Sequence, residues 1–245
     1  VSVVIGGAWN AAEEGADFAA IGGGGGNTMT ANATNSVIGG GWTNRISGSY
    51  SVIGGGQRNE VSGTNAVVAG GYSNLASGIS AAVPGGSQNQ AGGNYSLAAG
   101  RRAKARHNGT FVWADSTDRD FGSSKSNQFL IRASGGVGIG TTNPLQRLHV
   151  NGAVHIASST HHLTYPLDEP FLIGQWDGYG FYEQMRFLPN GSVGIGTASP
   201  IQRLHVAGGI HIAGASYSLT FRTNDTFRIG HYTGATFTER MCITT

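Results

Sequence analysis

The sequence predicts an all-β protein: an N-terminal parallel β-roll or β-solenoid with coils of about 15 residues, followed by two small β modules of 56 residues. Three observations predict it. A phrase such as SVIGGGWTNRISGSY, from Ser36, recurs every 15 residues over the first hundred, and a second phrase recurs at an offset of 56 residues. The chain also contains 42 glycines, which indicates many short strands joined by tight turns.

The composition excludes several classes of protein. Glycine does not recur at every third residue, which excludes collagen, and the regular return of Val, Ile and Leu argues against disorder. The net charge is +2 without a clustered basic face, so we expect no nucleic-acid partner. No run approaches the ~20 apolar residues of a transmembrane helix, so we expect no membrane insertion in this segment. The lone cysteine, Cys242, excludes an intrachain disulfide.

The first region, residues 1–100, divides into copies of strand, glycine turn, asparagine corner, second strand and second turn. Asparagine tolerates the left-handed conformation and bonds its own backbone, which suits it to a repeated corner. The predicted structural turn residues are Asn44, Asn59, Asn74, Asn89, Gly54, Gly55, Gly70 and Gly71. Stacked coils would rise about 4.8 Å each, the spacing between strands.

Each first strand carries an adjacent apolar pair, and adjacent strand residues point to opposite faces. The pairs are Val37 with Ile38, Val52 with Ile53, and Val67 with Val68. One member of each pair lines the lumen of the coil, whereas the other faces outward and needs a partner surface. The expected solution is a homotrimer packed about a common axis. A monomeric solenoid with a mildly apolar exterior is the alternative.

The motif that begins at Ser36 and repeats at Ser51, SVIGGG followed by Asn and Ser-Gly, resembles the head repeats of trimeric autotransporter adhesins. That resemblance covers about the first hundred residues. It implies left-handed parallel β-rolls closed into homotrimers and displayed on a bacterial surface. The family's usual repeat is one residue shorter than this one.

The period stops at residues 101–133, which we interpret as a junction or cap. Basic residues are followed there by acidic ones, with Phe111, Val112 and Trp113 between them. We expect the two charged stretches to pair between chains and to cover the end of the roll. Two alternatives stay open, a calcium site and a polyanion-binding ring from three chains. Their residues are Asp115, Asp118 and Asp120 for calcium, and Arg101, Arg102 and Lys104 for the ring.

The second region consists of module 1 at 134–189 and module 2 at 190–245, the latter expected to be truncated within a longer polypeptide. GVGIGTTNPLQRLHVNGAVHIA from Gly136 returns as SVGIGTASPIQRLHVAGGIHIA from Ser192. Strands are expected at 148–150, 154–157 and 181–188, with hairpin turns at 177–178 and 190–191. The motif resembles a repeat of phage tail fibres and related trimeric fibres. The glycines of GVGIGT lack the Lys and Ser/Thr of a phosphate loop, so a turn is expected there.

Two groups in the second region are candidate sites. Threefold symmetry would turn each strand histidine into a ring of three imidazoles, which suits a transition metal. These histidines are His149, His155, His205 and His211. However, Leu148 and Val150 are expected on the inner face, which turns His149 outward, so we predict no metal and no cofactor. Possible glycan contacts are Trp176, Tyr179 and Tyr232, for which a place in the module core is the alternative.

No nucleophile elbow or metalloprotease motif is present, and we predict that the chain is not an enzyme. The expected function is a structural segment of an extracellular homotrimeric fibre that supports host attachment through a cell-surface glycan or protein receptor. The fibre would belong to a virion tail or to a bacterial surface adhesin. A glycan-binding or depolymerising tailspike module is the alternative.

Overall fold

The computed structural model describes residues 1–154, 168–177, 179–208, 210, 227–232 and 237–243. Two compact units divide the chain, Val1–His155 and Ile156–Thr245. In the part that the structure describes, all regular elements are β-strands, and no helix is long and apolar enough to cross a lipid bilayer. The predicted all-β class is therefore confirmed.

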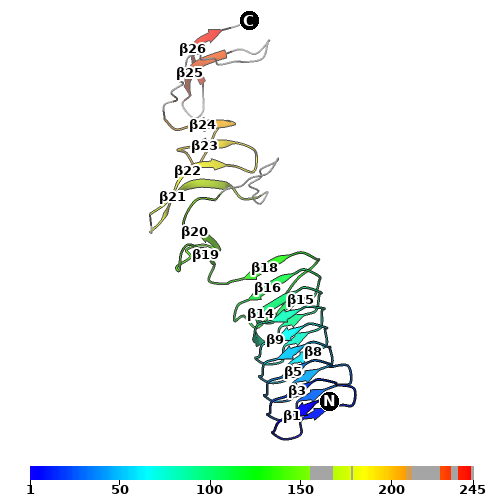
Figure 1. The fold of residues 1–245 in the computed structure, drawn as a ribbon. Coiled ribbons are helices and arrows are strands. Elements are labelled where there is room, and N and C mark those ends of the chain that lie inside the picture. Colours follow the sequence, from blue (N-terminus) through cyan, green and yellow to red (C-terminus); the bar gives the residue numbers. More distant parts are fainter. Residues whose placement is uncertain (155–167, 178, 209, 211–226, 233–236, 244–245) are drawn as a thin grey trace. The chain divides into compact units, whose positions relative to one another are not determined.

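The first unit is a parallel β-solenoid, in which successive coils stack as a ladder (Figure 1). Its ten-stranded sheet contains β1 (Val3–Val4), β3 (Ala20–Ile21), β5 (Val37–Ile38), β7 (Val52–Ile53), β9 (Val67–Val68), β11 (Ala82–Val83), β12 (Gly86–Ser87), β14 (Leu97–Arg101), β16 (Phe111–Ala114) and β18 (Phe129–Arg132). Its eight-stranded sheet contains β2 (Ala11–Ala12), β4 (Thr28–Met29), β6 (Arg45–Ile46), β8 (Glu60–Val61), β10 (Leu75–Ala76), β13 (Gln90–Ala91), β15 (Ala103–Ala105) and β17 (Phe121–Gly122).

The lumen of the solenoid is a narrow apolar core. Each two-residue strand turns one side chain inward, because adjacent strand residues face opposite ways. The inward members of the ten-stranded sheet include Ile38, Ile53 and Val68, and the other sheet contributes Ile46 and Val61. All five side chains are fully buried, so the walls of the coils themselves shield the core from solvent, and no helix in the described part of the chain covers it.

A ladder of buried asparagines follows the lumen, which corrects the prediction that they occupy left-handed corners. The residue before each asparagine takes the left-handed conformation instead, for example Arg58 (φ 56°) before Asn59 and Ser73 (φ 54°) before Asn74. That corner turns the amide inward. Asn74 Nδ2 donates to the carbonyls of Gly70 (2.9 Å) and Gly86 (3.0 Å), and Asn74 Oδ1 accepts the next coil's Asn89 N–H at 2.9 Å.

The four predicted turn glycines divide into three kinds. Gly71 has a φ of +96°, and a Cβ there would lie 2.1 Å from the carbonyl oxygen of Gly86. Gly54 has no left-handed φ, but a Cβ there would lie 2.4 Å from the carbonyl oxygen of Ala69. Gly55 and Gly70 have neither constraint. The close stacking of coils, as well as the turn itself, therefore selects glycine in this region.

The solenoid does not end near residue 100. Strand β14 pairs with β16, and β16 pairs with β18 as far as Arg132, while β15 and β17 extend the second sheet. The residues expected to form a separate junction are further coils of unequal length. The acidic and basic stretches pair within one chain, where Arg101 binds Asp118 and Arg102 binds Asp120.

The 56-residue repeat is visible in the strands. The parallel pair β19 (Val137–Ile139) and β20 (Leu148–Val150) belongs to the first unit, and β23 (Val193–Ile195) and β24 (Leu204–Val206) repeat it in the second. The hairpin of β21 (Phe171–Trp176) and β22 (Phe181–Phe187) is repeated by β25 (Phe227–Tyr232) and β26 (Phe237–Ile243). Both hairpins carry an irregularity at the same place, Ile173/Gly174 and Ile229/Gly230.

The boundary expected between residues 189 and 190 falls inside a four-stranded sheet. Strand β22 pairs with β23 across the turn at Asn190–Gly191, where Gly191 has a φ of +80°. The predicted strand 181–188 and this turn are therefore present. Val154 lies outside a strand, and the rest of the strand expected at 154–157 lies outside the described residues.

Candidate functional site

The outer face of the ten-stranded sheet carries one apolar residue per coil. Strand register places these residues in a single line, because each Cα is the ladder partner of the next. We call this line the apolar column: Val3, Ala20, Val37, Val52, Val67, Ala82, Leu97, Phe111 and Phe129. None is buried, and Val37, Val52 and Val67 are 38–42% exposed.

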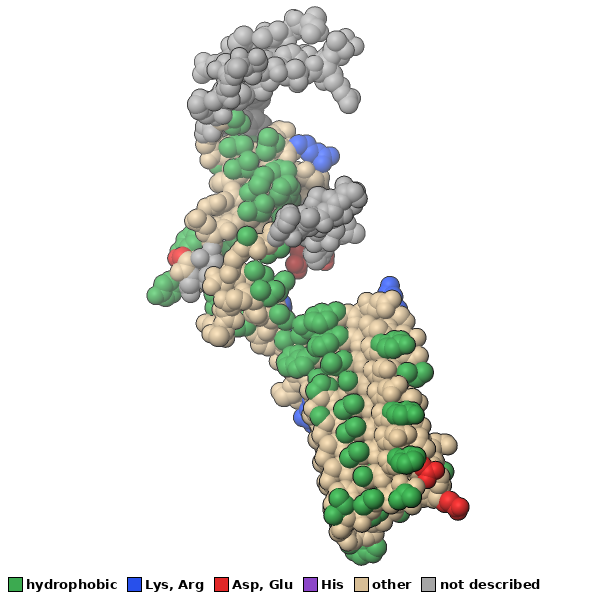
Figure 2. Space-filling model, in the orientation of Figure 1, with side chains coloured by type: hydrophobic (Ala, Val, Ile, Leu, Met, Phe, Trp, Pro, Cys, Tyr) green, Lys and Arg blue, Asp and Glu red, His purple; other side chains and the backbone are tan. Residues whose placement is uncertain are grey.

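The apolar surface widens at the end of the column. Phe111 and Phe129 stack with ring centroids 4.5 Å apart, and Trp113 and Ile131 lie one outward position further along the same strands. Figure 2 shows apolar side chains in columns along this part of the molecule. A continuous exposed strip of this kind is characteristic of an association surface.

The outer face of the eight-stranded sheet is different. Its outward row contains Arg45, Glu60, Gln90 and Lys104, and Arg45 Nη1 lies 3.1 Å from Glu60 Oε1. Because charged side chains keep their water at such a surface, this sheet is suited to solvent or to polar ligands.

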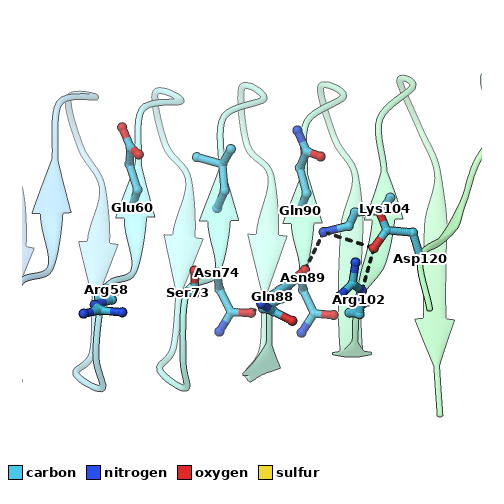
Figure 3. Close-up of a pocket in the computed structure, with 11 residues that line it drawn as sticks. Arg58, Glu60, Ser73, Asn74, Gln88, Asn89, Gln90, Arg102, Lys104 and Asp120 are labelled. Atoms are coloured by element: carbon cyan, nitrogen blue, oxygen red, sulfur yellow. Dashed lines mark hydrogen bonds and ion pairs between the residues drawn. The ribbon is translucent and has the colours of Figure 1, made fainter. Parts of the chain in front are cut away.

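An open groove with a volume of about 420 Å³ lies between this outward row and the left-handed corner residues (Figure 3). We call it the polar groove. Its corner row is Arg58, Ser73, Gln88 and Arg102, its sheet row is Glu60, Leu75, Gln90 and Lys104, and Asp120 closes one end. Figure 3 shows Arg58 and Glu60 at one end and Arg102, Lys104 and Asp120 at the other.

The Asp120 end of the groove is an ion-pair network. Arg102 Nε donates to Asp120 Oδ1 at 2.8 Å, and this bond lowers the pKa of the carboxyl group and raises the pKa of the guanidinium. Lys104 Nζ donates to the Gln88 carbonyl at 2.6 Å and lies 4.0 Å from Asp120. Desolvation lowers the pKa of Lys104, and the nearby Asp120 offsets part of that effect.

The Asp115 side chain stabilises the end of the solenoid through bonds within its own chain, rather than serving as a ligand-binding group. Its carboxylate accepts bonds from Ser134 N–H (2.7 Å), Thr117 N–H (3.1 Å) and Arg132 Nε (3.0 Å). These donors, with Ser134 first, hold the pKa of Asp115 well below its usual range. Asp118 pairs with Arg101 and Arg102, and Asp120 pairs with Arg102, so each of the three carboxylates proposed for calcium has an arginine partner.

Two exposed tryptophans meet on a third, narrower side of the coils. A line of isolated bridges joins Ala8, Gly25, Trp42, Gln57, Tyr72 and Ser87. The rings of Trp9 and Trp42 make an edge contact with centroids 6.1 Å apart. Gly25 makes this possible, because a Cβ there would lie 2.1 Å from the Trp42 ring.

Replacing Gly25 with alanine should therefore displace the Trp42 ring and break its contact with Trp9. We expect a loss of near-ultraviolet circular dichroism from the tryptophan pair, with far-ultraviolet dichroism unchanged because the ring is at the surface. Gly23→Ala is the matched control, since a Cβ at Gly23 meets no atom within 4 Å. An unchanged near-ultraviolet spectrum in Gly25→Ala would contradict the packing.

The candidate histidines take different places. His149 is half-buried and its Nδ1 accepts the Leu145 N–H at 3.3 Å, while Leu148 is exposed, contrary to the inner position expected for it. His205 is half-buried, with an Nδ1 atom that has no partner within the described residues. His155 and His211 lie outside the described residues. The described residues contain no group of three His, Cys, Asp or Glu that could hold a metal ion.

The predicted glycan contacts lie on or beside the two hairpins. Tyr179 is 95% exposed at the turn between β21 and β22, where Asp177 Oδ1 accepts the Tyr179 and Gly180 N–H groups at 2.9 Å. Trp176 is the last residue of β21 and Tyr232 is the last of β25. Glu183 pairs with Arg186. Asp177 and Glu183 are thus each engaged by groups of their own hairpin.

Sequence reasoning identified the apolar pairs but missed the polar groove. The repeat alignment contained a usable signal, since Arg58, Ser73 and Gln88 occupy one position of the repeat and Glu60, Leu75 and Gln90 another.

No protein-family model matches the chain, and the curated proteins contain no match to it. The β-solenoid fold and the two surfaces are therefore the basis for a function.

Proposed function

We propose that this chain is a structural, non-enzymatic segment of a homotrimeric extracellular fibre. The apolar column is the observation that carries the proposal. It extends over nine consecutive strands, about 40 Å at the usual strand spacing, and no member is charged. Burial of such a strip stabilises an assembly by the hydrophobic effect without removing water from any ion.

The partner that fits this strip is another copy of the same chain. An identical copy presents an apolar line with the same spacing, so the strips match coil by coil when the copies are aligned about a common axis. Three copies close around the axis and leave the charged eight-stranded sheets at a separate surface. The resemblance of both repeats to trimeric fibres supports this number.

The resemblances also suggest where the fibre acts. We assign it to a virion tail or to a bacterial surface, with the tail fibre favoured because the 56-residue repeat is the longer and more specific motif. The stacked coils act as a stiff spacer that holds a receptor-binding part away from the particle or cell. Flanking sequence distinguishes the two: a membrane β-barrel indicates an adhesin, and a baseplate-binding segment or a chaperone domain indicates a tail fibre.

Sedimentation velocity of the purified chain tests the assembly, and we expect a particle of three chains at micromolar concentration. Val52→Asp should convert it into folded single chains, because trimer formation would bury three carboxylates without partners. The association constant should fall at least roughly a hundredfold. The β-type far-ultraviolet dichroism should remain, since Val52 faces away from the lumen.

Thr28→Asp is the matched control, because Thr28 lies on the outer face of the other sheet beside Arg45. It adds the same charge and should leave the trimer intact. A well-folded single chain for the unmodified protein, or an unchanged trimer for Val52→Asp, would be incompatible with the proposal.

A further inference from the structure

We propose that the polar groove binds a linear, β-linked polysaccharide that carries carboxylate groups and lies along the stack of coils. The inference goes beyond the fibre role, because every residue of the groove comes from one chain and the site needs no second copy.

The spacing of equivalent residues along the groove matches the spacing of sugar units in such a ligand. Its two rows advance by one coil at a time, about 4.8 Å, which is close to the length of one pyranose unit in an extended β-linked chain. Ser73 is the smallest residue of the corner row and lies between Arg58 and Gln88. The resulting hollow over Ser73 and Leu75 accommodates a sugar ring, and Leu75 offers an apolar contact to the C–H face of the ring.

The uncharged polar residues suit hydroxyl groups. Gln88 and Gln90 each offer an amide donor and an amide acceptor, and Ser73 offers a hydroxyl that does both, which matches the mixed character of sugar hydroxyls. The backbone of Gln88 is fixed by Lys104, and Arg106 Nε lies 3.4 Å from Gln90 Oε1. The backbone of Gln88 and the side-chain amide of Gln90 are therefore both held by basic residues of the following coil.

The charges favour an acidic sugar chain over a neutral one. Among the charged residues that line the groove or form its ion pairs, basic side chains outnumber carboxylates. The basic residues are Arg45, Arg58, Arg102, Lys104 and Arg106, and the acidic residues are Glu60, Asp118 and Asp120. Glu60 is engaged by Arg45, and Asp120 is shared among Arg102, Lys104 and Arg106.

Arg58 is the cation best placed to meet a ligand carboxylate. It forms no ion pair within the part of the chain that the structure describes. Its Nη1 donates to the Tyr72 hydroxyl at 3.0 Å, and its guanidinium lies 5.9 Å from the Tyr72 ring centroid. These contacts orient the guanidinium and leave other N–H groups for a ligand.

The groove lining includes no aromatic side chain, which disfavours nucleic acid because single strands bind by base stacking.

Isothermal titration with a hexamer of β-1,4-mannuronate tests the proposal. The matched neutral probe is β-1,4-mannohexaose, which differs by the carboxylates, and hexaglutamate tests for a merely acidic polymer. We expect binding of the mannuronate, weakened by salt, and at least roughly tenfold weaker binding of the two other probes.

Two variants locate the site. Ser73→Gln fills the hollow without a change of charge, and the fold tolerates it because Gln88 already holds the same left-handed conformation in the next coil. Arg58→Gln removes the unpaired cation. Each should weaken mannuronate binding roughly tenfold, whereas Lys125→Gln removes a charge outside the groove and should leave binding unchanged.

Absence of mannuronate binding, equal binding of either comparison probe, or full binding by Ser73→Gln would overturn the proposal. The groove variants should sediment as the unmodified protein does, and Val52→Asp should still bind mannuronate as a single chain. Failure of the groove and failure of the trimer are therefore distinguishable.

Discussion

Replacement of Asn74 with leucine is expected to open the solenoid around its middle coils. The leucine leaves the buried Asn89 N–H and the Gly70 carbonyl without the bonds that Asn74 supplied. Each unsatisfied buried group costs about 1–3 kcal/mol, so the expected loss of stability is roughly 4 kcal/mol. That is a large part of the 5–15 kcal/mol that typically stabilises a folded domain.

Thermal unfolding followed by circular dichroism measures the loss, and amide hydrogen exchange localises it. Exchange should accelerate most in residues 70–100, because coils of a repeat protein contact mainly their neighbours. Asn32→Leu is the matched control, since Asn32 is exposed in a turn. Wild-type exchange rates in Asn74→Leu would show that the asparagine ladder contributes little.

Replacement of Ile53 with aspartate is expected to prevent formation of the solenoid. Ile53 is fully buried between Ile38 and Val68 of the neighbouring coils, and a carboxylate there has neither water nor a cation as a partner. An unpaired buried charge destabilises by on the order of 5 kcal/mol, comparable with the whole stability of a domain. Limited proteolysis and far-ultraviolet dichroism should show an unfolded or largely opened chain.

The adjacent residue provides the sharpest comparison. Val52→Asp adds the same carboxylate one residue earlier but on the outer face, so the chain should fold and lose only its assembly. Ile53→Val keeps the lumen apolar and should cost about 1 kcal/mol. A protease-resistant, fully β Ile53→Asp chain would mean that the lumen admits water.

The two proposals assign different tasks to the apolar column and to the polar groove. The outward residues of the ten-stranded sheet favour contact with other copies, while the corner and the eight-stranded sheet keep polar and charged groups in water. Under the two proposals, the segment is both a spacer and a lateral binding surface. A ligand that binds along several coils would also link those coils and oppose their separation.

Several features could be predicted from residues alone. The inward and outward members of pairs such as Val52 and Ile53 follow from the period of two along a strand, together with the 15-residue recurrence. The turn at Asn190–Gly191 follows from the left-handed preference of its residues. The repeated hairpins follow from the 56-residue offset.

Other features could not be predicted, for identifiable reasons. The continuation to Arg132 was missed because its coils change length, and the loops absorb the change while Leu97, Phe111 and Phe129 stay in register. The sequence alone favours Asn74 as the corner residue, because asparagine tolerates the left-handed conformation better than serine does. No local sequence signal indicates that the preceding Ser73 takes the left-handed φ instead.

The amino-acid sequence by itself determined the coil, its lumen side chains and the apolar residue that each coil turns outward, because these depend on local periodicity and on strand geometry. The tertiary structure alone decided which residues of different coils become neighbours. It buried the asparagines, joined the basic and acidic stretches within one chain, and formed a groove from residues that are 14 or 15 positions apart in successive coils. The physical reason is register: a parallel stack converts one position of a repeat into a continuous surface, and a surface has properties that no single copy has.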